Sequence, residues 1–170
     1  MIEKFTFDLQ SHQVRKKLVL VKSELELRTH VVLKLLAYLL FYDPRLQIET
    51  SVDMHYKPDL VIPGESGIPE LWIDCGKIAL RKVEKISTKL RASRIVIVKE
   101  THGELERFKK LIDKKVDAAF RLEYLAFDHD FISGIADSLQ RTNELTLYTV
   151  MENVIGIALN DQVFESFLYR

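Results

Sequence analysis

This sequence of 170 residues has one cysteine, no long apolar stretch and no net charge. Cys75 is the single cysteine, so no disulfide can form within the chain, and we expect a reducing compartment, the cytoplasm. The longest apolar stretch, 35–42, is much shorter than the roughly 20 residues that cross a bilayer, so we expect no membrane partner. Residues 1–5 lack the charged start and apolar run of a signal peptide.

The balanced net charge and the absence of common catalytic motifs exclude further classes of protein. The 25 basic and 25 acidic residues balance, which argues against binding nucleic acid by bulk charge. The sequence has no G-x-S-x-G, Walker loop or G-x-G-x-x-G, and its five histidines are not spaced like zinc ligands. Any catalytic chemistry must therefore come from another arrangement of residues.

The apolar patterns predict one domain over residues 1–170, large enough for a substantial core. Strands are predicted at 5–9, 17–22, 46–52, 59–62, 70–74, 94–98, 120–127, 144–148, 154–159 and 162–169. Helices are predicted at 23–42, 78–90, 103–115 and, as a short one, 128–139. This order favours an α/β fold with a mixed central β-sheet flanked by helices and extra β-strands at both termini.

Two acids stand at the ends of strand-like segments on either side of a turn cluster at 63–67. If these strands form a hairpin with Asp59 opposite Asp74 or Trp72, both carboxylates lie on one face, whereas a shift of one residue separates them. Such a pair, with the carbonyl of Cys75 as a further ligand, suits Mg²⁺ or Mn²⁺. The alternative is that Asp59 is only a turn residue and Asp74 only caps the following helix.

A third acid precedes the first long apolar helix. Glu26 and His30 are four residues apart, so a helix would place them on one face. Glu26 is a candidate metal ligand, directly or through water, and His30 a candidate phosphate contact. The alternatives are a capping box of Ser23 and Glu26, and a half-buried, hydrogen-bonded ring for His30.

The acid pair is the pattern with which PD-(D/E)xK nucleases hold Mg²⁺, but that motif requires lysine where this sequence has Gly76. The lysine positions the attacking water and stabilises the pentavalent phosphate. Lys85 is the favoured substitute, followed by Lys82 and then Lys77. Each is otherwise an exposed surface lysine.

A basic run follows the acid pair. Residues 77–94 hold seven basic residues and one acid. Lys82, Lys85 and Lys89 are candidates for contacts with the phosphates of DNA or RNA. The alternative is a solvated helix face without a ligand.

Several segments of the sequence resemble the YaeQ family. They are the apolar helix at 30–39 with the Ser/Glu segment before it, the strings 43–47 and 69–74 with Gly76, the basic helix, and the β-rich tail at 145–169. The resemblance implies a restriction-endonuclease-like fold, a variant of the PD-(D/E)xK type whose lysine is displaced.

By position, the resemblance matches Glu26, Asp59 and Asp74 to the acids of the family and Lys85 to its basic helix. It implies a Mg²⁺-dependent nuclease or phosphodiesterase. The alternative is a catalytically degenerate module on the same fold that binds nucleic acid or a protein partner.

Overall fold

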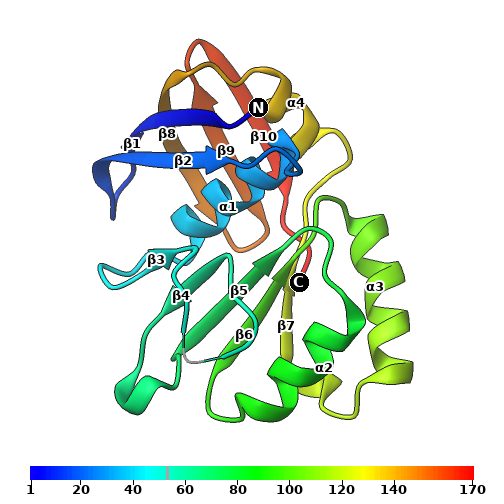
Figure 1. Ribbon diagram of the computed structural model, residues 1–170. Coiled ribbons are helices and arrows are strands. Elements are labelled where there is room, and N and C mark those ends of the chain that lie inside the picture. The colour runs from blue at the N-terminus through cyan, green and yellow to red at the C-terminus, as the bar shows by residue number, and fades with distance from the viewer. Residues whose placement is uncertain (53) are drawn as a thin grey trace. The chain divides into compact units, whose positions relative to one another are not determined.

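The computed structural model describes residues 1–52 and 54–170, which form two compact units. The terminal unit consists of Met1–Tyr42 and Phe127–Tyr169, and the central unit consists of Asp43–Ala126 with Arg170. Figure 1 labels their strands and helices. The terminal unit is therefore assembled from both ends of the sequence, with the central unit inserted between them.

The terminal unit contains a five-stranded sheet in the order β10-β9-β8-β1-β2. Its strands are β1 (Glu3–Gln10), β2 (Arg15–Lys22), β8 (Thr142–Met151), β9 (Val154–Leu159) and β10 (Gln162–Phe167). Neighbouring strands are antiparallel except β1 and β8, which pair in parallel with Thr6 beside Thr142. The two segments of the unit are thus joined at the middle of the sheet.

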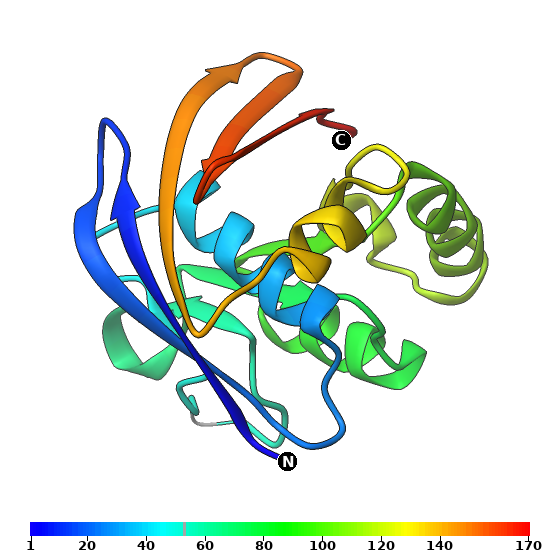
Figure 2. The ribbon, with the colours of Figure 1, turned by 90° about the horizontal axis from the view of Figure 1, so that it is seen from above.

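Helices α1 (Arg28–Leu40) and α4 (Phe131–Asp137) complete the terminal unit. Figure 2 shows the strands curving around these helices, and α1 contacts both α4 and β2. Alternate residues of β1, namely Phe5, Phe7 and Leu9, are buried, as expected for a strand with one face toward a core.

The central unit contains a second five-stranded sheet, in the order β3-β4-β5-β6-β7. Its strands are β3 (Gln47–Ile48), β4 (Leu60–Ile62), β5 (Leu71–Cys75), β6 (Arg94–Val98) and β7 (Leu122–Leu125). The first three are antiparallel and the last three parallel. Short 3₁₀-helices occupy Glu65–Gly67 and Ala119–Arg121.

The parallel strands are joined by α2 (Leu80–Lys89) and α3 (His102–Lys115), as parallel strands require crossover connections. Both helices pack on one face of the sheet. There Trp72, Ile95 and Ile97 share a buried cluster with Val83 and Ile86 of α2, with Ile112 of α3 and with Val116, the C-cap residue of α3. Because side chains alternate along a strand, Asp74 lies on the same face as Trp72.

The predicted order of strands and helices is confirmed, and so is the mixed α/β class. The strands predicted as additions at both termini form a sheet of their own. The strand predicted at 46–52 was too long, because it ends at Ile48 and Glu49 takes the left-handed backbone conformation with φ 50°. Within residues 1–52 and 54–170, no helix is long and apolar enough to cross a membrane.

Candidate functional site

The hairpin of β4 and β5 brings the two predicted acids together. Its register pairs Leu60 with Ile73 and Val61 with Trp72, and Asp59 and Asp74 are the next residues of the chain beyond the Leu60–Ile73 pair. The Asp59 N–H donates to the carbonyl of Ile73 at 3.0 Å, the residue that the register pairs with Leu60. The two carboxylates lie near enough for the charge of Asp59 to raise the pKa of Asp74.

Asp59 is held by the neighbouring strand. Its Oδ2 accepts a hydrogen bond from the backbone N–H of Cys75 at 2.7 Å. The residue therefore takes part in the β4–β5 pairing and is more than a turn residue after Pro58. The carbonyl of Cys75 as a metal ligand stays a prediction.

Asp74 is almost completely buried, with 1% of its surface exposed. Its Oδ2 accepts from the Trp72 indole Nε1 at 2.8 Å, and its Oδ1 accepts from the Lys82 ammonium at 2.7 Å. Since α2 begins at Leu80 with Ala79 as its N-cap residue, Asp74 is not the cap of that helix. Its two oxygens face a ring nitrogen and a cation.

Burial raises the pKa of Asp74 above its ordinary value. The Lys82 ammonium and the Trp72 N–H lower this pKa, whereas the charge of Asp59 raises it further. The ionised carboxylate is thus disfavoured by desolvation and by a neighbouring acid. A further cation beside the pair would relieve both effects.

Of the three lysines proposed as substitutes for position 76, Lys82 is the one that contacts Asp74. Its ammonium also donates to the carbonyl of Lys57 at 2.9 Å. Lys85 and Lys77 are exposed, as is Lys89 at the end of α2. Their roles in catalysis or phosphate contact stay predictions.

A fourth lysine, which the sequence interpretation missed, lies at the end of β6. Lys99 is 7% exposed, its Nζ lies 2.5 Å from the carbonyl oxygen of Gly76, and it stands 4.1 Å above the ring centroid of Phe108. Burial lowers the pKa of its amine, while nearby Glu104, Cys75 and Asp74 oppose the shift. The sequence pattern that could have revealed Lys99 is its spacing, because Ile95, Ile97 and Lys99 are two residues apart and fall on one face of a strand.

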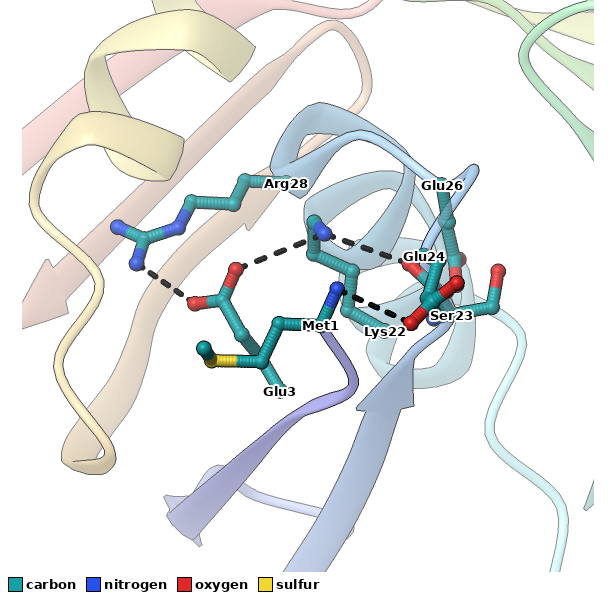
Figure 3. Close-up of polar contacts among 7 residues, drawn as sticks. All are labelled: Met1, Glu3, Lys22, Ser23, Glu24, Glu26 and Arg28. Atoms are coloured by element: carbon teal, nitrogen blue, oxygen red, sulfur yellow. Dashed lines mark hydrogen bonds and ion pairs between the residues drawn. The ribbon is translucent and has the colours of Figure 1, made fainter.

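Glu26 and His30 belong to the terminal unit. Helix α1 begins at Arg28, later than predicted, because residues 23–27 form a turn in which Glu26 Oε2 accepts from the N–H of Ser23 at 3.1 Å. Figure 3 shows Glu26 and Ser23 in this loop, close to the ion pairs that Glu3 makes with Lys22 and Arg28.

Glu26 nevertheless meets His30, whose Nδ1 lies 2.9 Å from Glu26 Oε1. The same oxygen lies 2.5 Å from the ammonium of the buried Lys34. The signal for Lys34 is a single charge in the apolar run of α1. That Glu26 joins the aspartate pair as a third acid stays a prediction, as does a phosphate contact of His30.

The donor set of the aspartate pair is suited to a hard divalent cation. Across the part of the chain that the structure describes, no three His, Cys, Asp or Glu side chains converge as a ready metal cage. Mg²⁺, however, is commonly bound through one or two carboxylates, with water and substrate phosphate as its other ligands. Asp59 and Asp74 meet this requirement, and Lys82 is the cation that would compete for Asp74.

In the part of the chain that the structure describes, two mixed five-stranded sheets with four α-helices define a mixed α/β protein, and Asp59 and Asp74 lie at one end of the β4–β5 hairpin. The chain belongs to the YaeQ family, whose sequence model, described as YaeQ protein, matches residues 11–166. No curated protein matches the sequence.

Two crystal structures are similar to this chain. The YaeQ protein from Xanthomonas axonopodis pv. citri is 18% identical, with 98% of this chain and 95% of that chain covered and a TM-score of 0.76. The YaeQ protein from Pseudomonas syringae is 17% identical, with 98% and 93% covered and a TM-score of 0.73. At these identities the likeness shows the shared fold.

Proposed function

We propose that the central unit binds Mg²⁺ or Mn²⁺ at Asp59 and Asp74 and hydrolyses a phosphodiester bond of DNA or RNA. The observation that carries the proposal is the β4–β5 hairpin, beside whose end these two acids lie near enough to interact through their charges. The charge of Asp59 raises the pKa of Asp74, which fits a pair whose repulsion a bound cation would relieve.

The residues of the chain have separate tasks in this reaction. Asp59 and Asp74 would hold the ion, and the Cys75 N–H and Trp72 indole fix their carboxylates in place. The ion, when bound, supplies a water of lowered pKa and offsets charge on the phosphate. Without the ion, the Lys82 ammonium neutralises the charge of Asp74. Once the ion has taken its place beside Asp74, Lys82 still donates its hydrogen bond to the Lys57 carbonyl.

The ion pair between Lys82 and Asp74 favours a second function, binding without cleavage. The Lys82 ammonium already lies 2.7 Å from Asp74 Oδ1, so the chain carries its own cation at the place of the metal. This supports a catalytically degenerate module that binds nucleic acid or a protein partner without cleavage. The two functions differ in whether removing Lys82 frees a metal site.

The test is a Mn²⁺ titration followed by the fluorescence of Trp72, the single tryptophan, whose indole contacts Asp74. Cleavage of single- and double-stranded DNA and RNA is measured in parallel. We expect saturable binding that Asp74→Asn abolishes, together with a loss of cleavage of at least about 100-fold. Asp117→Asn, which changes an exposed acid of the same unit, is the matched control and leaves both unchanged.

Lys82→Met separates the two functions. If a metal binds the aspartate pair, removal of the competing ammonium tightens Mn²⁺ binding. Absence of saturable Mn²⁺ binding in both the parent and Lys82→Met would refute the metal-dependent nuclease and favour the binding module.

A further inference from the structure

Lys99 is a buried ammonium that is only partly hydrogen-bonded. The side chain of lysine has three N–H donors and no acceptor. Among residues 1–52 and 54–170, the carbonyl of Gly76 is the acceptor that Lys99 Nζ contacts, and no carboxylate lies within ion-pair distance of it. The ring of Phe108 covers another side of the ammonium. A buried charge with unused donors is costly unless a ligand completes its shell.

Lys82 provides the contrast within the same unit. Its ammonium contacts both Asp74 Oδ1 and the Lys57 carbonyl, so its charge is balanced by a carboxylate. Lys82 therefore orients and neutralises Asp74. Among the described residues Lys99 has no carboxylate within ion-pair distance, although Glu104 and Asp74 act on it from farther away, so its ammonium keeps N–H donors for a ligand.

The position of Lys99 places its unused N–H donors next to Gly76 and on the face of the sheet that carries Asp74. In the parallel pairing of β5 and β6, Asp74 lies beside Ile97 and Cys75 beside Val98, so Lys99 follows next to Gly76. The chain takes φ +74° at Gly76, and the Gly76 N–H donates to the carbonyl of Val98 at 2.8 Å. Lys99 thus delivers an ammonium to position 76 from the neighbouring strand, on the face that carries Asp74.

We propose that Lys99 is the anion-binding group of this site, where its ammonium binds a phosphoryl oxygen of a phosphodiester or of free phosphate. The catalytic part of this inference rests on the proposed function. In hydrolysis the water oxygen bonds to phosphorus as the bond to the leaving oxygen breaks. The leaving oxygen keeps the electron pair of that bond and receives one proton of the water through the solvent, and the other proton stays with the phosphate product or passes to the solvent. Lys99 binds the charge that grows on the phosphoryl oxygens and neither gives nor takes a proton.

The binding test uses inorganic phosphate as the probe, with the full chain, in the presence of EDTA and of Mg²⁺. The backbone amide signals of Gly76 and Lys99 are followed by nuclear magnetic resonance. We expect saturable shifts in the parent, stronger with Mg²⁺ because the carboxylates are then neutralised, and at least about tenfold weaker binding in Lys99→Met. Lys109→Met is the matched control, because Lys109 also lies over an aromatic ring, that of Tyr124.

Lys109→Met is expected to bind phosphate as the parent does. Equal phosphate binding by Lys99→Met and the parent, or no saturable shift in the parent under either condition, would overturn the assignment.

The catalytic test measures Mn²⁺ affinity and cleavage together. We expect Lys99→Met to keep the Mn²⁺ affinity of the parent within about twofold while the rate of cleavage falls by about 100-fold, the effect of removing one transition-state donor. Cleavage that depends on Asp74 but not on Lys99 refutes the inference and leaves the proposed function intact. Phosphate binding that depends on Lys99 in a chain without metal binding refutes the proposed function and supports Lys99 as an anion site.

Discussion

Lys99 and Lys34 are two buried lysines with different surroundings. Lys34 is fully buried and lies 2.5 Å from the carboxylate of Glu26, so its charge is paired. Lys99 contacts a neutral carbonyl and an aromatic ring. A paired buried charge is costly to break, whereas an incompletely paired one lowers stability as it stands. Lys99 is therefore a residue at which function and stability are expected to conflict.

We predict that Lys99→Met raises the melting temperature at neutral pH. Burial lowers the pKa of this amine below 10.5, so below the folded-state pKa the buried ammonium carries its full desolvation cost. The unfolded chain binds more protons between the two pKa values, so the stability of the parent rises with pH there. The advantage of Lys99→Met should accordingly shrink as pH approaches 10.5.

Thermal unfolding of both proteins between pH 7 and 10.5 tests this prediction. A lower melting temperature of Lys99→Met at neutral pH would mean that the ammonium is fully compensated in the folded chain.

At this scale the sequence predicts some contacts and not others. Asp59 and Asp74 could be placed together because a turn cluster lies between two strand-like segments. The choice of Lys82 over Lys85 could not be made, because it depends on where α2 begins and hence on which side chains face the sheet. Lys99 could not be found from the motif because it reaches Gly76 from a neighbouring strand.

At the scale of elements, β8 shows how a strand accommodates an irregularity. Its pairing with β9 shifts between Leu147 and Thr149. The intervening Tyr148 donates from its hydroxyl to Glu165 Oε1 at 2.9 Å, and its ring crosses Gly156 of β9. A Cβ at Gly156 would stand 2.7 Å from this ring, so any larger residue there must displace the Tyr148 side chain.

We predict that Gly156→Ala lowers the free energy of unfolding by about 1–3 kcal/mol, the usual cost of overpacking. The added methyl group must displace the Tyr148 ring and its hydrogen bond to Glu165. Urea unfolding measures the loss. In a Tyr148→Ala background the same substitution should cost much less, and an equal cost in both backgrounds would contradict the assigned clash.

Helix α2 is the second element with a testable property. Lys85 and Lys89 are exposed on it, whereas Lys82 is engaged by Asp74 and Lys57. We predict salt-dependent binding of oligonucleotides. Lys85→Met and Lys89→Met should each reduce the slope of log K against log[salt] by about one.

Fluorescence anisotropy at several salt concentrations measures this slope. Lys115→Met, which removes an exposed lysine at the end of α3, is the control and should leave the slope unchanged. An identical change in all three variants would indicate a general charge effect.

The order of the elements could be predicted because turn residues and apolar periodicity mark each segment locally. Several boundaries could not. Residues 23–27 have helical spacing but form a turn held by the Glu26 carboxylate, and Glu49 ends β3 through its positive φ. In both cases a local hydrogen bond or backbone conformation prevails over the apolar pattern.

At the scale of the whole molecule, the important feature is connectivity. The terminal unit comes from residues 1–42 and 127–169, which meet where β1 pairs with β8. Apart from Arg170, the central unit is one continuous segment between them. If the central unit were unfolded, pairing β1 with β8 would close a flexible loop that includes Asp43–Ala126. The entropic cost of closing such a loop is about 4 kcal/mol. The sequence could not predict two separate sheets, because this pairing links residues far apart in the chain.

We therefore predict that destabilising the central unit also loosens the terminal unit. Ile97→Ala removes a fully buried side chain of β6 and should cost about 2–5 kcal/mol. Native-state hydrogen exchange should then show faster exchange of the Phe7 amide in β1. Leu111→Ala, at a residue 46% exposed on α3, is the control. Unchanged exchange at Phe7 in Ile97→Ala would show that the sheet closes independently of the insert.

The parallel pairing of Thr6 with Thr142 also has a consequence for biosynthesis. At about 5–20 residues per second, β8 leaves the ribosome on the order of ten seconds after β1. Phe5, Phe7 and Leu9, all buried in the finished sheet, belong to a strand that lacks this central neighbour throughout that interval. We expect the nascent chain to be a client of ribosome-associated chaperones until its last strands have been made.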